Sequence, residues 1–158
     1  MDHSVKTGIA FGLTSGVITT LGLMVGLHSG THSDMVVLGG VMTIAIADAF
    51  SDALGIHISE ESENVHTAKE IWTSTIVTFF AKFFCAISFL IPLFLFDLPN
   101  AIRASVAWGA ILMTAMSWQI ARSQNRRALP IILEHLAVMA LVITATHSLG
   151  KWISGWAN

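Results

Sequence analysis

Long apolar runs separated by short polar segments organise the whole chain of 158 residues. A membrane-spanning helix needs about 20 mainly apolar residues, whereas a barrel strand needs only about 10 alternating ones. The runs have the helical length, so the pattern predicts an all-α integral membrane protein with a bundle of five transmembrane helices. The expected spans are residues 8–28, 35–58, 72–96, 101–121 and 129–153, in one transmembrane domain over residues 1–158.

Composition agrees with a chain that lies in a lipid bilayer. Hydrophobic residues make up 54% of the sequence and charged residues 11%, against about 25% charged residues in an ordinary soluble domain. The net charge of −2 leaves no basic surface for nucleic acid. Cys85 is the single cysteine, which excludes a disulfide within the chain. No small-residue cleavage site follows the first apolar run, so we expect it to be a retained helix.

The distribution of basic residues predicts the orientation of the spans. Cytoplasmic loops carry an excess of Lys and Arg over the loops on the other side. One side collects Lys6, Lys69, Arg122, Arg126 and Arg127, and the other collects only Arg103 and Lys151. We therefore expect the N-terminus in the cytoplasm and the C-terminus outside. The short chain suits a prokaryotic plasma membrane.

The first expected span carries a stripe of small residues at steps of three or four positions. Its members are Gly8, Gly12, Gly16, Thr19, Gly22, Gly26 and Gly30. In lipid no hydrophobic force drives helices together, and small residues supply contact by letting two backbones approach closely. The stripe predicts either a homodimer packed through this helix or a contact with another helix of the same chain.

Two aspartates lie well inside the second expected span. Asp48 and Asp52 are four residues apart, which places both on one helix face. An ionised Asp at the bilayer centre costs about 2.5–3.5 kcal/mol, so a cation, a basic partner or a proton must compensate. If the helix continues beyond the apolar run, Glu63, His66 and Glu70 fall on the same face. Such a column of carboxylate and imidazole ligands favours divalent ions such as Fe²⁺, Mn²⁺ or Zn²⁺ over Cu(I).

An explanation without transport competes with this interpretation. Lys82 lies about ten residues into the third expected span, at a depth close to that of Asp52. An ion pair of Lys82 with Asp52 or Asp48 would neutralise one carboxylate for purely structural reasons and leave the other without a partner. The acidic segment of residues 60–70 likewise fits a solvated cytoplasmic turn.

The histidines and the catalytic motifs add less. His28 and His32 flank the expected outer turn, where they suit either an exit-side site or an ordinary place at the interface. For His135 and His147, in the fifth span, hydrogen-bonded packing is the more common role. No nucleophile with its base is recognisable, nor is a His-Glu-x-x-His motif, so we expect no enzymatic activity.

Two segments resemble the vacuolar iron transporter family of divalent metal exporters. Residues 15–27, Ser-Gly-Val-Ile-Thr-Thr-Leu-Gly-Leu-Met-Val-Gly-Leu, are similar to that family's opening helix. Residues 47–59, Ala-Asp-Ala-Phe-Ser-Asp-Ala-Leu-Gly-Ile-His-Ile-Ser, are similar to its Ala-Gly-Ala-Ile-Ser-Met-x-x-Gly-Glu-Tyr-x-Ser segment. The chain departs from the pattern at Ser15, Asp52 and Ile56, where the family has Asp, Met and Glu. It also lacks the long acidic cytoplasmic helices of many members, so the resemblance is to a short, divergent member.

The resemblance implies a homodimer that exports metal from the cytoplasm in exchange for protons, along a pathway lined by the first helices. The leading hypothesis is therefore a proton-coupled antiporter for Fe²⁺ or Mn²⁺, with the metal as substrate and no permanently bound cofactor. Asp48 and Asp52 would be ligands and proton carriers, Ser15, Thr19 and Met24 would line the pathway, and Glu63, His66 and Glu70 would capture metal at its mouth. The alternative is a non-transporting membrane subunit in which Lys82 pairs with the aspartates.

Overall fold

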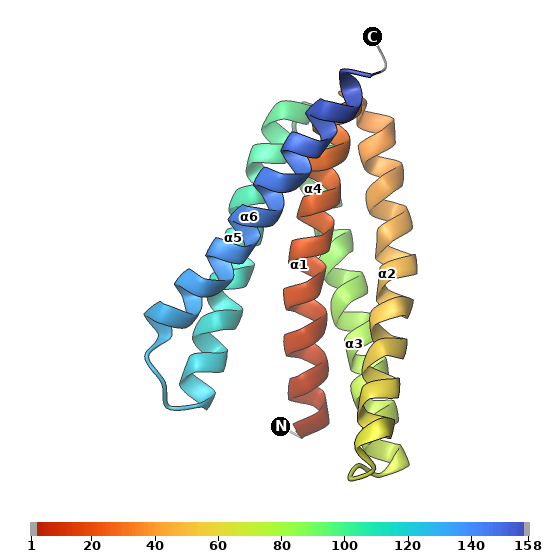
Figure 1. Ribbon diagram of the computed structural model, residues 1–158, viewed down its shortest axis with the longest axis vertical. Coiled ribbons are helices and arrows are strands. Elements are labelled where there is room, and N and C mark those ends of the chain that lie inside the picture. The colour runs from red at the N-terminus through yellow and green to blue at the C-terminus, as the bar shows by residue number, and fades with distance from the viewer. Residues whose placement is uncertain (1–2, 157–158) are drawn as a thin grey trace.

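The computed structural model describes residues 3–156, and every regular element in that range is a helix. The helices are α1 (His3–Thr31), α2 (Asp34–Glu63), α3 (Ala68–Ser88), α4 (Leu90–Leu95), α5 (Leu98–Ser123) and α6 (Ala128–Ser154). They form an elongated bundle, and the start of α1 and the end of α6 lie at opposite ends of it (Figure 1).

The prediction of a helical membrane protein with five spans is confirmed. Within residues 3–156, five helical segments are long and apolar enough to cross a membrane: α1, α2, Ala68–Leu95, α5 and α6. Each extends a few residues beyond its apolar run. At α2 and α3 the extension reaches a polar capping residue, because Ser33 and Thr67 accept hydrogen bonds from the first backbone N–H groups of these helices.

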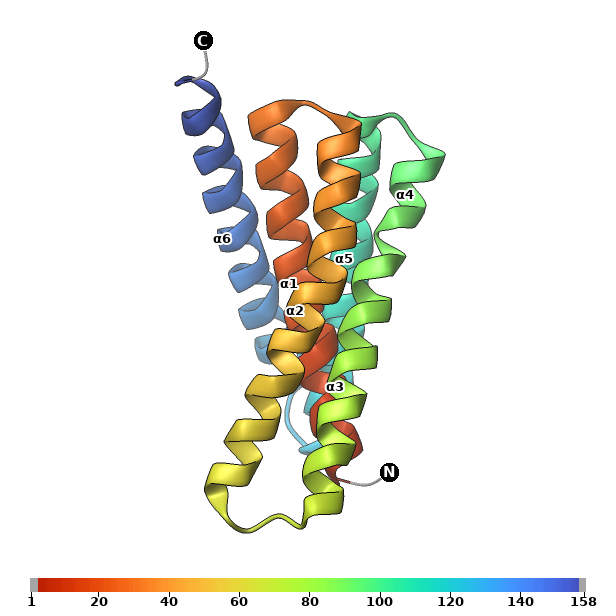
Figure 2. The ribbon, with the colours of Figure 1, turned by 90° about the vertical axis from the view of Figure 1, so that its right-hand side faces the viewer.

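The third span is broken into α3 and α4 near its C-terminal end. Pro92 has no N–H to donate to the carbonyl group of Ser88, four residues earlier, and its ring crowds that carbonyl. The helix accordingly stops at Ser88 and resumes at Leu90. The short α4 packs on α5 and lies beside the start of that helix (Figure 2).

Helix α1 lies at the centre of the bundle, where it contacts α2, α3, α5 and α6. Its glycines serve two neighbours of the same chain: Gly8, Gly12 and Gly16 face α3, and Gly22, Gly26 and Gly30 face α6. A Cβ atom at Gly12 would lie 2.7 Å from the carbonyl oxygen of Thr78, and one at Gly22 would lie 2.9 Å from a methyl carbon of Val142. The predicted use of Gly8, Gly12, Gly16, Gly22 and Gly26 as dimer packing is therefore wrong, because helices of the same chain already occupy these surfaces.

Candidate functional site

Asp48 and Asp52 lie near the middle of the longest helix. Helix α2 has 30 residues, which corresponds to a length of about 45 Å. The two aspartates lie about 21 Å and 27 Å from its start, on successive turns. Water is therefore remote from both carboxylates along the helix axis, and their charge has to be balanced by groups within the bundle.

The side chain of Lys82 from α3 bridges both carboxylates. Its Nζ atom lies 2.6 Å from Asp48 Oδ2 and donates hydrogen bonds to Asp52 Oδ2 and, over 2.8 Å, to Ser15 Oγ on α1. The predicted ion pair is thus present, although it involves both aspartates instead of one. One ammonium group joins three helices through three oxygen atoms.

The charges in this cluster do not balance. Two carboxylates and one ammonium group leave one negative charge, and residues 3–156 provide no further ion pair to either aspartate. Asp48 is the less firmly held of the two, since its Oδ2 atom has a close ionic contact but no hydrogen bond of good geometry. The side chains of Asp48 and Asp52 are 24% and 18% exposed, against 2% for Lys82. Both carboxylates therefore keep some surface that the other helices of the chain leave uncovered.

The glycines of α1 allow Lys82 to reach α2. A Cβ atom at Gly16 would lie 3.4 Å from Lys82 Cγ and 3.2 Å from Cys85 Cβ, and one at Gly12 would lie 3.1 Å from the Lys82 backbone nitrogen. Because neither position has a side chain, α3 packs closely on α1 and the aliphatic part of Lys82 extends along the α1 surface. The small-residue stripe thereby positions the ammonium group, a role that its spacing alone did not reveal.

The acidic column does not continue from the aspartates into the predicted mouth. Helix α2 ends at Glu63, because Asn64 adopts a left-handed conformation with φ of 54° and its N–H bonds back to the carbonyl of Glu61. The prediction that His66 and Glu70 share one continuous helix face with the aspartates is therefore wrong. Asn tolerates this conformation better than other residues with side chains, which explains why the helix stops here.

The residues of the predicted mouth instead have local partners. His66 Nε2 lies 3.2 Å from a carboxylate oxygen of Glu63, three residues earlier. The Glu70 carboxylate accepts hydrogen bonds from the N–H and hydroxyl groups of Thr67, at 2.8 and 2.7 Å, and completes a capping box at the start of α3. These contacts stabilise the turn between α2 and α3 and form no site with the aspartates.

The described part of the chain contains no group of three or more His, Cys, Asp or Glu side chains arranged to hold a metal ion. Of the predicted ligand set, Asp48, Asp52, Glu63, His66 and Glu70, the structure brings together only the two aspartates. His28 and His32, whose ring centres lie 5.5 Å apart, likewise belong to no such group.

The predicted pathway residues have different environments. Ser15 lies in the cluster itself, and Thr19, one turn further, donates a hydrogen bond to the Ser15 carbonyl over 3.0 Å. Thr19 also borders a groove between α1, α2 and α6. Met24, in contrast, is wholly buried in the apolar core, so its position does not fit the predicted pathway role.

The two histidines of the fifth span are hydrogen-bonded within the bundle. His147 Nδ1 lies 2.5 Å from Ser29 Oγ, and His135 Nδ1 lies 2.8 Å from Ser117 Oγ. The Ser117 hydroxyl donates to a carbonyl of its own helix, so it accepts the hydrogen bond from His135. Each histidine therefore has a hydrogen-bond partner on a neighbouring helix.

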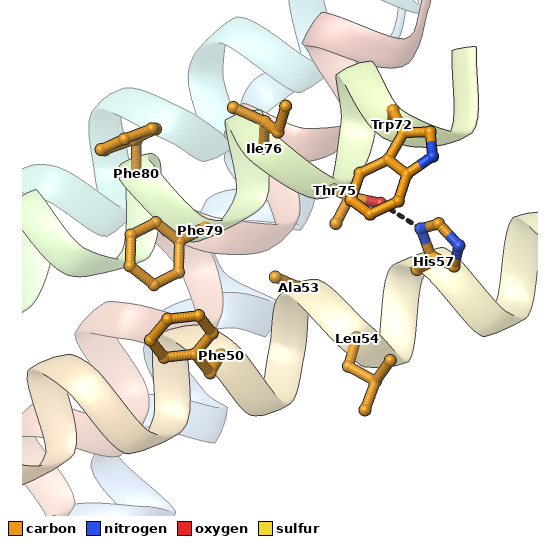
Figure 3. A pocket seen from close by; sticks show the side chains of 9 residues that line it. All are labelled: Phe50, Ala53, Leu54, His57, Trp72, Thr75, Ile76, Phe79 and Phe80. Carbon is orange, nitrogen blue, oxygen red and sulfur yellow. Dashed lines mark hydrogen bonds between the residues drawn. The ribbon is translucent and has the colours of Figure 1, made fainter. Parts of the chain in front are cut away.

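A groove of about 390 Å³ lies between α2 and α3, and its lining includes Phe50 and Ala53 from the turns of α2 that carry the aspartates. Figure 3 shows its nine lining side chains, which are Phe50, Ala53, Leu54, His57, Trp72, Thr75, Ile76, Phe79 and Phe80. Their polar contact is a hydrogen bond of 3.0 Å between His57 Nδ1 and Thr75 Oγ1, and none of the nine carries a carboxylate. The groove is mainly apolar, and the imidazole of His57 is hydrogen-bonded to Thr75.

Glu60 is a buried carboxylate that the sequence interpretation placed in a solvated turn. It is 7% exposed and accepts a hydrogen bond from Ser74 of α3. The signal was available in the helical periodicity, because Glu60 lies seven residues after the buried Ala53 and eleven after the buried Ala49. Its contact joins the C-terminal end of α2 to α3.

Fold and site together define an integral membrane protein with a carboxylate–lysine cluster inside its spans. The sequence matches no model of a known protein family, and no curated protein matches it.

Proposed function

We propose that this chain is a proton-coupled transporter of divalent cations that exports Fe²⁺ or Mn²⁺ from the cytoplasm. The observation that carries the proposal is the pair of aspartates held by a single lysine, with one negative charge left over inside the span. A purely structural ion pair needs one carboxylate for one ammonium group, and well-packed apolar residues often serve stability as well or better. A second carboxylate inside the span is energetically unfavourable, and a role in cation binding explains its presence.

The oxygen atoms of the cluster suit a hard divalent ion. Carboxylate and hydroxyl oxygen atoms are preferred ligands of Mn²⁺, and Asp48, Asp52 and Ser15 supply them at one point of the bundle. Protons neutralise the same carboxylates that a metal ion would neutralise, so the two substrates exclude each other at this site. Mutual exclusion at one site is the basis of exchange transport, in which the carboxylates release metal on the side where they take up protons.

The proposed transporter is a homodimer, and its interface lies on α2 instead of on the glycine stripe of α1. Ser51, Gly55 and Ser59 form a small-residue stripe on the exposed face of α2, beside the two aspartates. A Cβ atom at Gly55 would meet nothing within 4 Å, so a second helix has room to approach. A second copy on this face would shield the carboxylates from lipid. Ser51→Cys tests it: a disulfide-linked dimer supports this interface, and a monomer under oxidation contradicts it.

The transport proposal is tested in proteoliposomes that contain the full-length chain. We expect Mn²⁺ entry coupled to proton movement in the wild type, and a loss of at least about tenfold in Asp52→Asn, because the ligand and proton carrier is removed. Asp34→Asn is the matched control, since Asp34 is an exposed aspartate at the start of the same helix. It should transport like the wild type.

The alternative function is a non-transporting membrane subunit, and the bridging position of Lys82 is the observation that favours it. In that case Asp52→Asn would change the thermal stability of the protein without any effect on ion flux. Wild-type liposomes that move neither Fe²⁺, Mn²⁺ nor Zn²⁺ would exclude the transporter and leave the structural subunit.

A further inference from the structure

The ammonium group of Lys82 occupies the place that a transported cation needs. Its three oxygen neighbours are Ser15 Oγ, Asp48 Oδ2 and Asp52 Oδ2, which are the same oxygen atoms that the proposed transport assigns to the metal ion. The ammonium group has three N–H donors, so these three neighbours match its capacity. An ion that binds the same three oxygen atoms therefore has to displace the lysine, which requires another acceptor within its reach.

Thr78 provides such an acceptor one helical turn away. It lies four residues before Lys82 on α3 and is fully buried, and its hydroxyl oxygen has no hydrogen-bond partner. The hydroxyls of Thr73 and Thr75 on the same helix donate to the carbonyls four residues earlier, at 2.7 and 2.6 Å. Thr78 therefore departs from the usual arrangement in a place where an unused polar group costs stability.

The geometry of α3 makes Thr78 accessible to the lysine. Side chains four residues apart on a helix are neighbours, and long side chains in helices point towards the N-terminal end of the helix. Lys82 and Thr78 are therefore neighbours on successive turns of α3. Both residues face α1: a Cβ atom at Gly12 would touch the Thr78 carbonyl oxygen at 2.7 Å and the Lys82 nitrogen at 3.1 Å.

We infer that Lys82 is a tethered cation that competes with the transported ion for the Asp48–Asp52–Ser15 oxygen atoms, and that its ammonium group moves to the Thr78 hydroxyl when the ion binds. This role rests on the proposed transport, and it means that the Lys82 ammonium group occupies the cation site when no metal ion is bound. With the lysine in place, the empty cluster carries one net negative charge instead of two, which lowers the cost of the empty carrier within the membrane.

The test measures the dissociation constant of Mn²⁺ for the purified full-length protein, together with its thermal unfolding. In Thr78→Val, which has nearly the same volume, the displaced ammonium group loses its acceptor. A hydrogen bond to a charged group contributes about 1.5–3 kcal/mol, so we expect Mn²⁺ to bind at least about tenfold more weakly. The unfolding temperature should not fall, because the hydroxyl has no partner in the metal-free protein.

Ser105→Ala is the matched control. It removes another fully buried hydroxyl without a partner, on α5, and should leave the Mn²⁺ dissociation constant unchanged. Wild-type affinity in Thr78→Val, or an equal loss of affinity in Ser105→Ala, would overturn the inference. If the wild type still moves Mn²⁺ in liposomes, the transport proposal survives that result.

Lys82→Gln tests the competition from the opposite direction. Without the ammonium group the two carboxylates are free for the metal, so we expect Mn²⁺ to bind at least about tenfold more tightly, and millimolar Mn²⁺ to raise the unfolding temperature of this variant. Unchanged or weaker binding by a folded Lys82→Gln protein would overturn the inference. The Thr78→Val measurement stands even when Lys82→Gln fails to fold. A wild type that binds no Mn²⁺ would overturn both this inference and the proposed transport.

Discussion

The two acidic regions of this chain use similar residues in opposite ways. In the turn between α2 and α3, Glu63 and Glu70 have partners within three residues, supplied by His66 and Thr67. In the middle of α2, the aspartates depend on a lysine from another helix, 30 residues or more away along the chain. At the end of the bundle, water solvates the carboxylate oxygen atoms that have no partner in the turn. Inside a span there is no such water, so each charged side chain needs a partner from another part of the fold.

The loss of a charged partner should affect the free energy of unfolding much more in the middle of α2 than in the turn. A carboxylate at the protein surface costs little when its partner is lost, since exposed ion pairs contribute about 0–1 kcal/mol. A buried pair that loses one member leaves an uncompensated charge in a medium of low dielectric constant. Variants at the two regions should therefore differ by several-fold in their effect on stability.

The largest effect is expected for Lys82→Met. This change leaves two neighbouring carboxylates without their cation, and breaking a buried pair in this way typically costs about 3–5 kcal/mol. The free energy of unfolding, measured by denaturant titration in mixed micelles, should fall accordingly. The triple variant that adds Asp48→Asn and Asp52→Asn should recover most of the loss, because no charge is left in the cluster. A single variant as stable as the wild type would show that the ion pairs contribute nothing.

A smaller loss is expected when α3 is pushed away from α1. In Gly12→Ala the new Cβ atom meets backbone at 2.7 Å, and overpacking of this kind costs about 1–3 kcal/mol. Gly39→Ala at an exposed position of α2 is the control, because a Cβ atom there meets nothing within 4 Å. It should leave stability unchanged or raise it by up to about 1 kcal/mol through helix propensity. Equal effects of the two changes would contradict the close α1–α3 contact.

The third effect concerns the turn alone. Thr67→Ala removes the side chain that caps α3, and such a loss costs about 1 kcal/mol. Unfolding should report this difference, while Mn²⁺ flux in liposomes should match the wild type. A flux that falls with Thr67→Ala would mean that the turn takes part in transport after all.

The smallest effect is expected for Glu63→Gln at the same turn. Its contact with His66 is exposed, so stability should change by less than about 1 kcal/mol. Because the structure does not connect Glu63 to the aspartates, the Mn²⁺ concentration for half-maximal flux should also stay the same. An increase of about tenfold in that concentration would restore Glu63 to the metal path and weaken the contrast between the two regions.

Much of the architecture was predictable because hydropathy is a local property. Runs of about 20 apolar residues can only be accommodated as helices in a bilayer, so all five spans were predicted within a few residues of their observed ends. The pairing of Lys82 with the aspartates also followed from sequence, since equal depth in two neighbouring spans brings charges to one level. The end of α2 was not predicted. The helical spacing of polar residues continues past Asn64 in the sequence, whereas the helical backbone ends at Glu63.

The sequence by itself determined the class of protein, the number of its spans and the presence of charges that need compensation inside them. Tertiary structure decided which surfaces those residues use. Small residues permit the close approach of another helix, but their spacing does not show which helix that is. The tertiary packing places α3 of the same chain, and not a second copy, against Gly12 and Gly16. That contact carries Lys82 across α1 to both aspartates and to Ser15, because the position of a long side chain is set by its neighbours in space.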